Sequence, residues 1–155
     1  MKKFSLLWAF IALAILTPLI IAGYVHYQQD HFTCEDHLTV IDEKTQFELQ
    51  MRFTFSGGKG RYESYGSYQA AGHAPIAISN QITFSYWREP QKIIMVSDDT
   101  NELPKREEPL LKDAPDFFHS RNRGMATELV SVNSQSHLFL SEHVPVMYCM
   151  RVNHK

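Results

Sequence analysis

The sequence predicts a mainly β protein, in which a single N-terminal transmembrane helix precedes an antiparallel β domain of about seven or eight strands. Three observations lead there. One long apolar stretch lies near the N-terminus, the remainder alternates apolar and polar residues between turn signals, and helical periodicity is not sustained after the first stretch. Because open strand edges invite aggregation, a small domain of this kind is expected to be a barrel or a lipocalin-like sandwich.

The first element is the apolar stretch in "MKKFSLLWAFIALAILTPLIIAGYVHY". About 20 apolar residues rising about 1.5 Å each match a hydrocarbon layer of about 30 Å. Lys2 and Lys3 favour a cytoplasmic N-terminus, and Trp8 and Tyr24 suit the two water interfaces. We expect four parts: a cytoplasmic stub at 1–3, a transmembrane signal anchor at 4–24, a juxtamembrane collar at 25–31 and an exported β domain at 32–155.

A cleaved signal peptide is the alternative for this segment. It shares the charged start, but its apolar run is shorter, roughly 7 to 15 residues, and ends in small residues. Ile21-Ala22-Gly23 is a mediocre cleavage site. The longer run favours an uncleaved anchor, which would leave too little chain in the cytoplasm for any chemistry there.

The next elements are strands. A first strand is expected at about 33–42, and a second at 46–55, where apolar and polar side chains alternate in "QFELQMRFTF". The glycines of "SGGKG" suit a hairpin turn into "RYESYGSYQAAG". The segment "APIAISNQITFSYWRE" repeats the alternation, with Asn80 as one polar intrusion.

The last third is less regular. "KIIMVS" predicts a short strand, and residues 98–124, interrupted by three prolines, predict a long loop with one helical turn. "TELVSVN", "HLFLS" and "VPVMYCMRV" predict the two or three final strands.

The apolar faces of these strands supply the candidate interior. Core packing is the ordinary fate of such a face, and a partly open lumen for a small apolar ligand or an edge completed by a partner strand is the alternative. The core-lining or ligand-lining candidates are Phe47, Leu49, Met51, Phe53, Phe55, Ile82, Phe84 and Tyr86.

The two cysteines, Cys34 and Cys149, lie in the first and last predicted strands. In an oxidising compartment we expect them to form a disulfide, and closing a loop of about 115 residues stabilises by about 4 to 5 kcal/mol on chain entropy. Two buried free thiols are the alternative. Neither residue has the C-x-x-C context of a redox site.

Composition and motifs argue against several function classes. Fifteen basic and seventeen acidic residues give a formal net charge of -2, which offers no footprint for nucleic acid. The eight histidines show no metal-ligand spacing, and "SGGKG" lacks the G-K-[ST] ending of a phosphate loop. Asp98, Asp99 and Glu102 lack a calcium-loop pattern and are expected in a solvated loop. We therefore expect no catalytic residue, metal or cofactor.

The order of a lone membrane span and an alternating exported domain, with "SGGKGRYESYGSY" and the ending "HLFLSEHVPVMYCMRV", resembles the FidL-like membrane proteins of enteric bacteria. Such proteins are similar in size and topology to the small accessory partners of ToxR-like regulators, which are membrane-anchored winged-helix transcription factors. The resemblance implies a single-pass protein of the inner membrane with a periplasmic C-terminal domain that contains Cys34 and Cys149.

The function that this resemblance implies is non-enzymatic. The protein would bind and stabilise the periplasmic domain of a ToxR-like regulator, with contacts in the bilayer as well, and contribute to a site for an amphipathic ligand such as a bile salt or fatty acid. Two alternatives stay open: a tethered lipocalin-like module that binds its ligand alone, and an envelope subunit released by signal cleavage.

Overall fold

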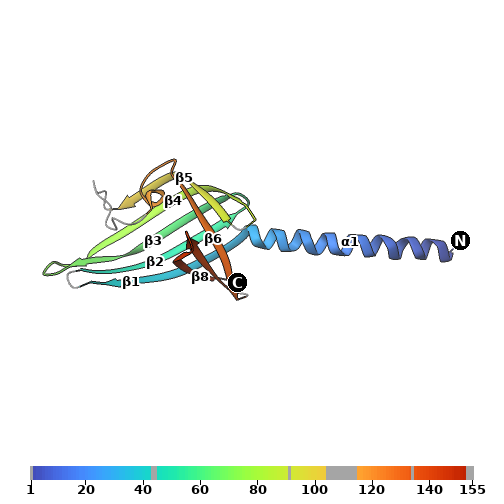
Figure 1. The fold of residues 1–155 in the computed structure, drawn as a ribbon, viewed down its shortest axis with the longest axis horizontal. Coiled ribbons are helices and arrows are strands. Elements are labelled where there is room, and N and C mark those ends of the chain that lie inside the picture. Colours follow the sequence, from blue (N-terminus) through green and yellow to red (C-terminus); the bar gives the residue numbers. More distant parts are fainter. Residues whose placement is uncertain (1, 43–44, 91, 104–114, 134, 153–155) are drawn as a thin grey trace. The chain divides into compact units, whose positions relative to one another are not determined.

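The computed structural model describes residues 2–42, 45–90, 92–103, 115–133 and 135–152, and it divides into two compact units, Met1–His31 and Phe32–Lys155. The first unit contains helix α1, Lys2–Asp30, so residues 25–30 of the expected collar continue the helix, and His31 begins the first strand (Figure 1). Its segment Phe10–Asp30 is apolar and long enough to cross a membrane. Pro18 lies inside the helix, and the Thr17 hydroxyl donates to the Leu13 carbonyl, which is the kind of local pairing that membrane helices use around proline.

The second unit is a closed barrel of eight antiparallel strands, which confirms the predicted fold class. Each strand pairs with the next along the chain, and the last returns to the first. Neighbours of this kind need only short connections, so the order follows from the closely spaced turn signals. The strands are β1 His31–Ile41, β2 Thr45–Ser56, β3 Lys59–Ala70, β4 Ile76–Arg88, β5 Lys92–Leu103, β6 Gly124–Asn133, β7 Ser136–Ser141 and β8 Val144–Arg151.

The hairpin of β2 and β3 fixes which side chains face inward. Its strands pair without interruption from Thr45↔Ala70 to Ser56↔Lys59. The turn consists of Gly57 and Gly58, both at positive φ, a conformation that glycine adopts without steric cost. The "SGGKG" turn predicted from the sequence is therefore confirmed.

The barrel is taller on one side than on the other. Strands β2 to β5 have 12 or 13 residues, whereas β7 and β8 have 6 and 8. The described register of β5 with β6 ends at Val96↔Gly124, and that of β1 with β8 covers only Cys34↔Arg151 and Glu35↔Met150. Beyond these pairs, the long strands extend past the short ones.

The extension of β5 corrects one prediction. Residues 98–103 were expected in a loop but belong to β5, where they pair with β4 as far as Ser79↔Leu103. Beyond Val96, no described strand pairs with the second edge of β5. Charged residues such as Asp98 and Glu102 are typical of such an edge, so their polarity was misread as a loop signal. The single helical turn was predicted correctly as η1, Asp116–Phe118; residues 104–114 of the predicted loop lie outside the described part.

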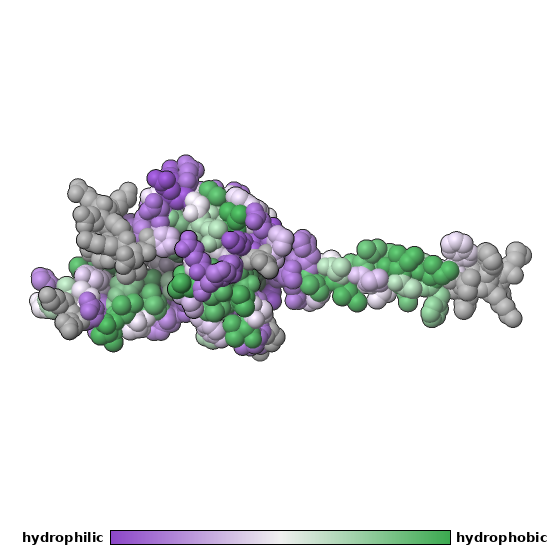
Figure 2. Space-filling view, in the orientation of Figure 1, coloured by the Kyte–Doolittle hydropathy of each residue, from purple (hydrophilic) through white to green (hydrophobic). Residues whose placement is uncertain are grey.

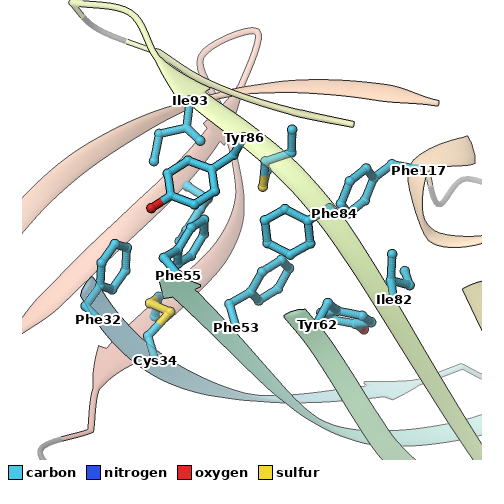
Figure 3. Packing of buried hydrophobic residues seen from close by; sticks show 13 residues of the cluster. Phe32, Cys34, Phe53, Phe55, Tyr62, Ile82, Phe84, Tyr86, Ile93 and Phe117 are labelled. Atoms are coloured by element: carbon cyan, nitrogen blue, oxygen red, sulfur yellow. A yellow bond between two sulfur atoms is a disulfide. The ribbon is translucent and has the colours of Figure 1, made fainter. Parts of the chain in front are cut away.

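The main core lies where the short strands close the barrel, and we call this part the core half. Figure 3 shows the rings of Phe55, Phe84 and Tyr86 packed against one another, with centroids 5.1 to 5.6 Å from Phe55. A Cβ atom on Gly60 would lie 2.3 Å from the Phe84 ring, so glycine is needed there for the ring to cover the β3 backbone.

A covalent link closes the seam between the first and last strands. Cys34 of β1 and Cys149 of β8 lie at disulfide-bonding distance, with Cα atoms 5.3 Å apart, and both are fully buried (Figure 3). Among the described residues, the register of β1 with β8 covers two pairs, so the cross-link joins strands whose described pairing is short.

Candidate functional site: the barrel cavity

A cavity of about 370 Å³, partly open to solvent, lies inside the taller part of the barrel. Its walls include a second apolar cluster, Phe47, Leu49 and Ile78, with Leu38 beside it. We call this part the cavity half. Its volume is within the range of about 300 to 1,000 Å³ that is usual for small-molecule sites.

The residues predicted to line the interior divide between the two halves. Phe47, Leu49, Met51 and Phe53 of β2 line the cavity. The others, Phe55, Ile82, Phe84 and Tyr86, belong to the core cluster and do not line it. One face of β2 therefore serves both as core and as cavity wall. The inward face of β4 divides in the same way, because Ile78 lines the cavity whereas Ile82, Phe84 and Tyr86 belong to the core.

Tyr62 lies at the boundary between core and cavity. Its ring packs against Phe53 at 4.7 Å and against Phe118 at 5.0 Å between centroids. Burial raises the pKa of Tyr62 to about 12, and a hydrogen bond with Ser64 acts in the opposite direction. The phenol is therefore neutral at physiological pH, and it forms part of the cavity wall.

A set of polar residues interrupts the apolar wall, and among them are Asn80, Glu102, His119 and Thr127. Asn80 and Glu102 are register partners on β4 and β5. The Asn80 amide nitrogen donates to the Phe118 carbonyl at 2.8 Å, and His119 Nδ1 lies 3.4 Å from Glu102 Oε2. These contacts fasten the turn η1 to the two long strands.

Two further observations describe the surroundings of these polar residues. His119 Nε2 is buried and has no hydrogen-bond partner in the described part of the chain, so no described hydroxyl is placed for activation by that nitrogen. In the same described ranges, no group of three or more His, Cys, Asp or Glu side chains is arranged to hold a metal ion.

No known protein family, curated protein or solved structure matches this chain. The assignment of a function therefore depends on the geometry of the barrel itself.

The outside of the barrel carries an apolar surface over β6 and β8. Figure 2 shows hydrophobic side chains where β8 lies in Figure 1. In cross-strand register, Val130 of β6 is followed by Leu138 of β7 and Tyr148 of β8. We call this surface the outer apolar face; its exposed members, each at least 41% exposed, are Val130, Val132, Val144, Tyr148 and Met150.

Sequence reasoning assigned no role in a site to the polar group in the cavity. Asn80 is a polar residue at a position that the alternation of β4 places on the inward face, so the sequence could have indicated it. The sequence places Glu102 in an expected solvated loop, and His119 is one of eight histidines without metal-ligand spacing. Their contact joins residues 17 positions apart across a connection without periodicity, so the sequence does not reveal it. Thr127 gave no signal, because threonine is common on both faces of strands.

Proposed function

We propose that the protein is a non-enzymatic, single-pass protein of the bacterial inner membrane whose periplasmic barrel binds a small amphipathic molecule. The observation that carries this proposal is the cavity of about 370 Å³ with an apolar wall and a few convergent polar groups. Such a combination is the usual form of a small-molecule site, since apolar area supplies affinity and polar atoms fix orientation.

The apolar helix α1 would hold the barrel at the membrane. Helix α1 is exposed along its apolar length, with Leu13, Leu19 and Ile20 each more than 60% exposed, as suits a lipid-facing span. Lys2 and Lys3 favour the orientation that exports the barrel. A tethered barrel of this kind samples amphiphiles close to the membrane surface.

Methionine methyl groups provide a direct test in the full-length protein. Met51, Met125 and Met147 line the cavity, whereas Met150 lies outside it and is 58% exposed. Carbon-13 methyl spectra of the protein in lipid nanodiscs would be followed during titration with cholate or decanoate. We expect saturable shifts of the three cavity methyls and a constant Met150 signal. Absence of cavity shifts with every amphiphile would reject the proposal.

A pair of variants on one strand provides the control. Ile78 is 8% exposed and lines the cavity, while Ile76 is 42% exposed and does not line it. The substitution Ile78→Trp should fill the cavity and reduce binding by about tenfold or more. Ile76→Trp should leave the affinity unchanged; an equal loss in both variants would indicate general damage to the strand.

The outer apolar face favours a second candidate function, binding of a protein partner. Contiguous exposed apolar residues on a folded domain are typical of interaction surfaces. Combined with the resemblance to FidL-like proteins, this face favours the periplasmic domain of a ToxR-like regulator as the occupant. Binding would stabilise the folded form of that domain by mass action.

Site-specific cross-linking in intact cells tests this second function. A photoreactive residue at Val130, on the outer apolar face, should cross-link to a winged-helix membrane regulator. One at Gln50, on the exposed side of β2, should not. Equal capture from both positions, or capture from neither, would contradict a role for this face.

A further inference from the structure

Three buried polar atoms of cavity-lining residues are without hydrogen-bond partners among the described residues. They are Asn80 Oδ1, His119 Nε2 and Thr127 Oγ1. Thr127 is 1% exposed, so its hydroxyl is shielded from bulk water. Buried polar atoms in folded proteins are usually paired, because an unpaired one loses its hydration without compensation. Three such atoms on one cavity indicate a ligand that completes them.

The hydrogen bonds around these atoms define their chemical character. Asn80 uses its amide nitrogen on the Phe118 carbonyl, which leaves its carbonyl Oδ1 as an acceptor toward the cavity. The Glu102 carboxylate only accepts, so His119 Nδ1 carries the proton in that contact, and Nε2 of the neutral ring is then an acceptor. The Thr127 hydroxyl both donates and accepts.

Two acceptors and one hydroxyl are complementary to a group that donates a hydrogen bond. A ligand hydroxyl fits at either of two places on the wall: it can donate to Asn80 or His119, or exchange a hydrogen bond with Thr127. A carboxylate fits poorly, because it has no proton to donate and would lie close to the charge of Glu102. The apolar wall formed by Phe47, Leu49 and Met51 would hold the remainder of the molecule.

We propose that the cavity selects a neutral apolar molecule that bears a hydroxyl group, in preference to a carboxylate amphiphile such as a fatty acid. This inference rests on the proposed ligand-binding function and names its ligand class. Asn80 and His119, beside η1, and Thr127, on β6, are the hydroxyl-binding groups of the cavity, and the β2 side chains belong to its apolar wall.

A series of ten-carbon probes separates hydroxyl recognition from simple burial of a chain. Decanol, decyl methyl ether and decanoate would be titrated into the full-length protein in nanodiscs of uncharged lipid at about pH 8, with the methyls of Met51, Met125 and Met147 as reporters. Each affinity is corrected for partitioning into empty nanodiscs. We expect decanol to bind about tenfold more tightly than the ether, which lacks the donor, and more tightly than decanoate.

Substitutions at Thr127 add two readouts that move in opposite directions. Thr127→Val removes the buried hydroxyl at nearly constant shape, so it should raise the thermal midpoint of the unliganded protein by a few degrees. It should also weaken decanol binding by about fivefold with little effect on the ether. Thr127→Ser, which restores a hydroxyl, should recover the preference for decanol.

The outcomes distinguish the inference from the function on which it rests. Equal affinities for decanol and the ether, or tighter binding of decanoate, would overturn the hydroxyl preference while leaving a ligand-binding barrel. Failure of every probe to shift the cavity methyls would overturn both. The probe series in the unsubstituted protein decides the question even if Thr127→Val does not fold.

Discussion

The core half and the cavity half of the barrel contain the same kind of strand, yet they differ in what covers the inward face. In the core half, Phe55 of β2 is 1% exposed and contacts rings from β1 and β4. In the cavity half, Phe47 of the same strand lines an open volume. The difference follows the strand lengths: β7 and β8 have 6 and 8 residues against 12 in β2, so they face only part of its length.

This comparison shows how one barrel provides stability and binding in separate places. Aromatic packing and the cysteine pair lie in the core half, so the cavity half does not need complete packing to hold the fold. An apolar wall without contacts on one side loses dispersion energy, which a bound molecule would supply. The following predictions test whether stability and binding are separated in this way.

The largest effect is expected from loss of the cysteine pair. The double variant Cys34→Ser, Cys149→Ser should lose about 4 to 5 kcal/mol of unfolding free energy by the chain-entropy account, since the link closes a loop of 115 residues. Denaturant unfolding of the full-length protein, with and without reductant, would measure this. Thiol labelling of the denatured, unreduced protein should detect no free cysteine; labelling of both would contradict the cross-link.

A smaller effect, and a direct comparison of the two halves, comes from truncating two rings of β2. Phe55→Ala should cost about 3 to 5 kcal/mol, because it leaves a void in packed surroundings. Phe47→Ala should cost at most about half as much, because part of its ring already faces open volume. Equal costs in denaturant unfolding would show that the cavity half is packed as tightly as the core half.

The sequence predicts the inward parity of β2 well, because alternation over ten residues distinguishes the two faces of a strand without tertiary information. It does not distinguish Phe47 from Phe55, which have the same residue type and parity. Their fates depend on where β6 to β8 end, a property of segments some 80 residues further along the chain. The contact of Glu102 with His119 is hidden for the same reason, since it crosses a connection that has no regular pattern.

The smallest predicted effect concerns acid tolerance of the core half. His137 of β7 packs near the Phe32 ring, at 5.7 Å between centroids, and its buried Nδ1 has no hydrogen-bond partner among the described residues. Burial lowers the pKa of His137 below the usual 6.5, and the positive charges of Arg151 and Arg88 lower it further. A charged imidazole is therefore less stable in the folded barrel than in the unfolded chain.

The sign of the pH effect follows from proton binding. Below about pH 6.5 the unfolded chain binds a proton at His137 that the folded barrel does not, so this residue reduces stability as the pH falls through 6.5 toward the lowered folded-state pKa. His137→Gln should reduce the loss of unfolding free energy between about pH 7.5 and about pH 5.5. His73→Gln, in the exposed connection between β3 and β4, is the matched control. If His137→Gln and His73→Gln both keep the pH dependence of the original protein, the core half tolerates a charged His137. The core half and the polar-lined cavity half would then differ less than their packing indicates.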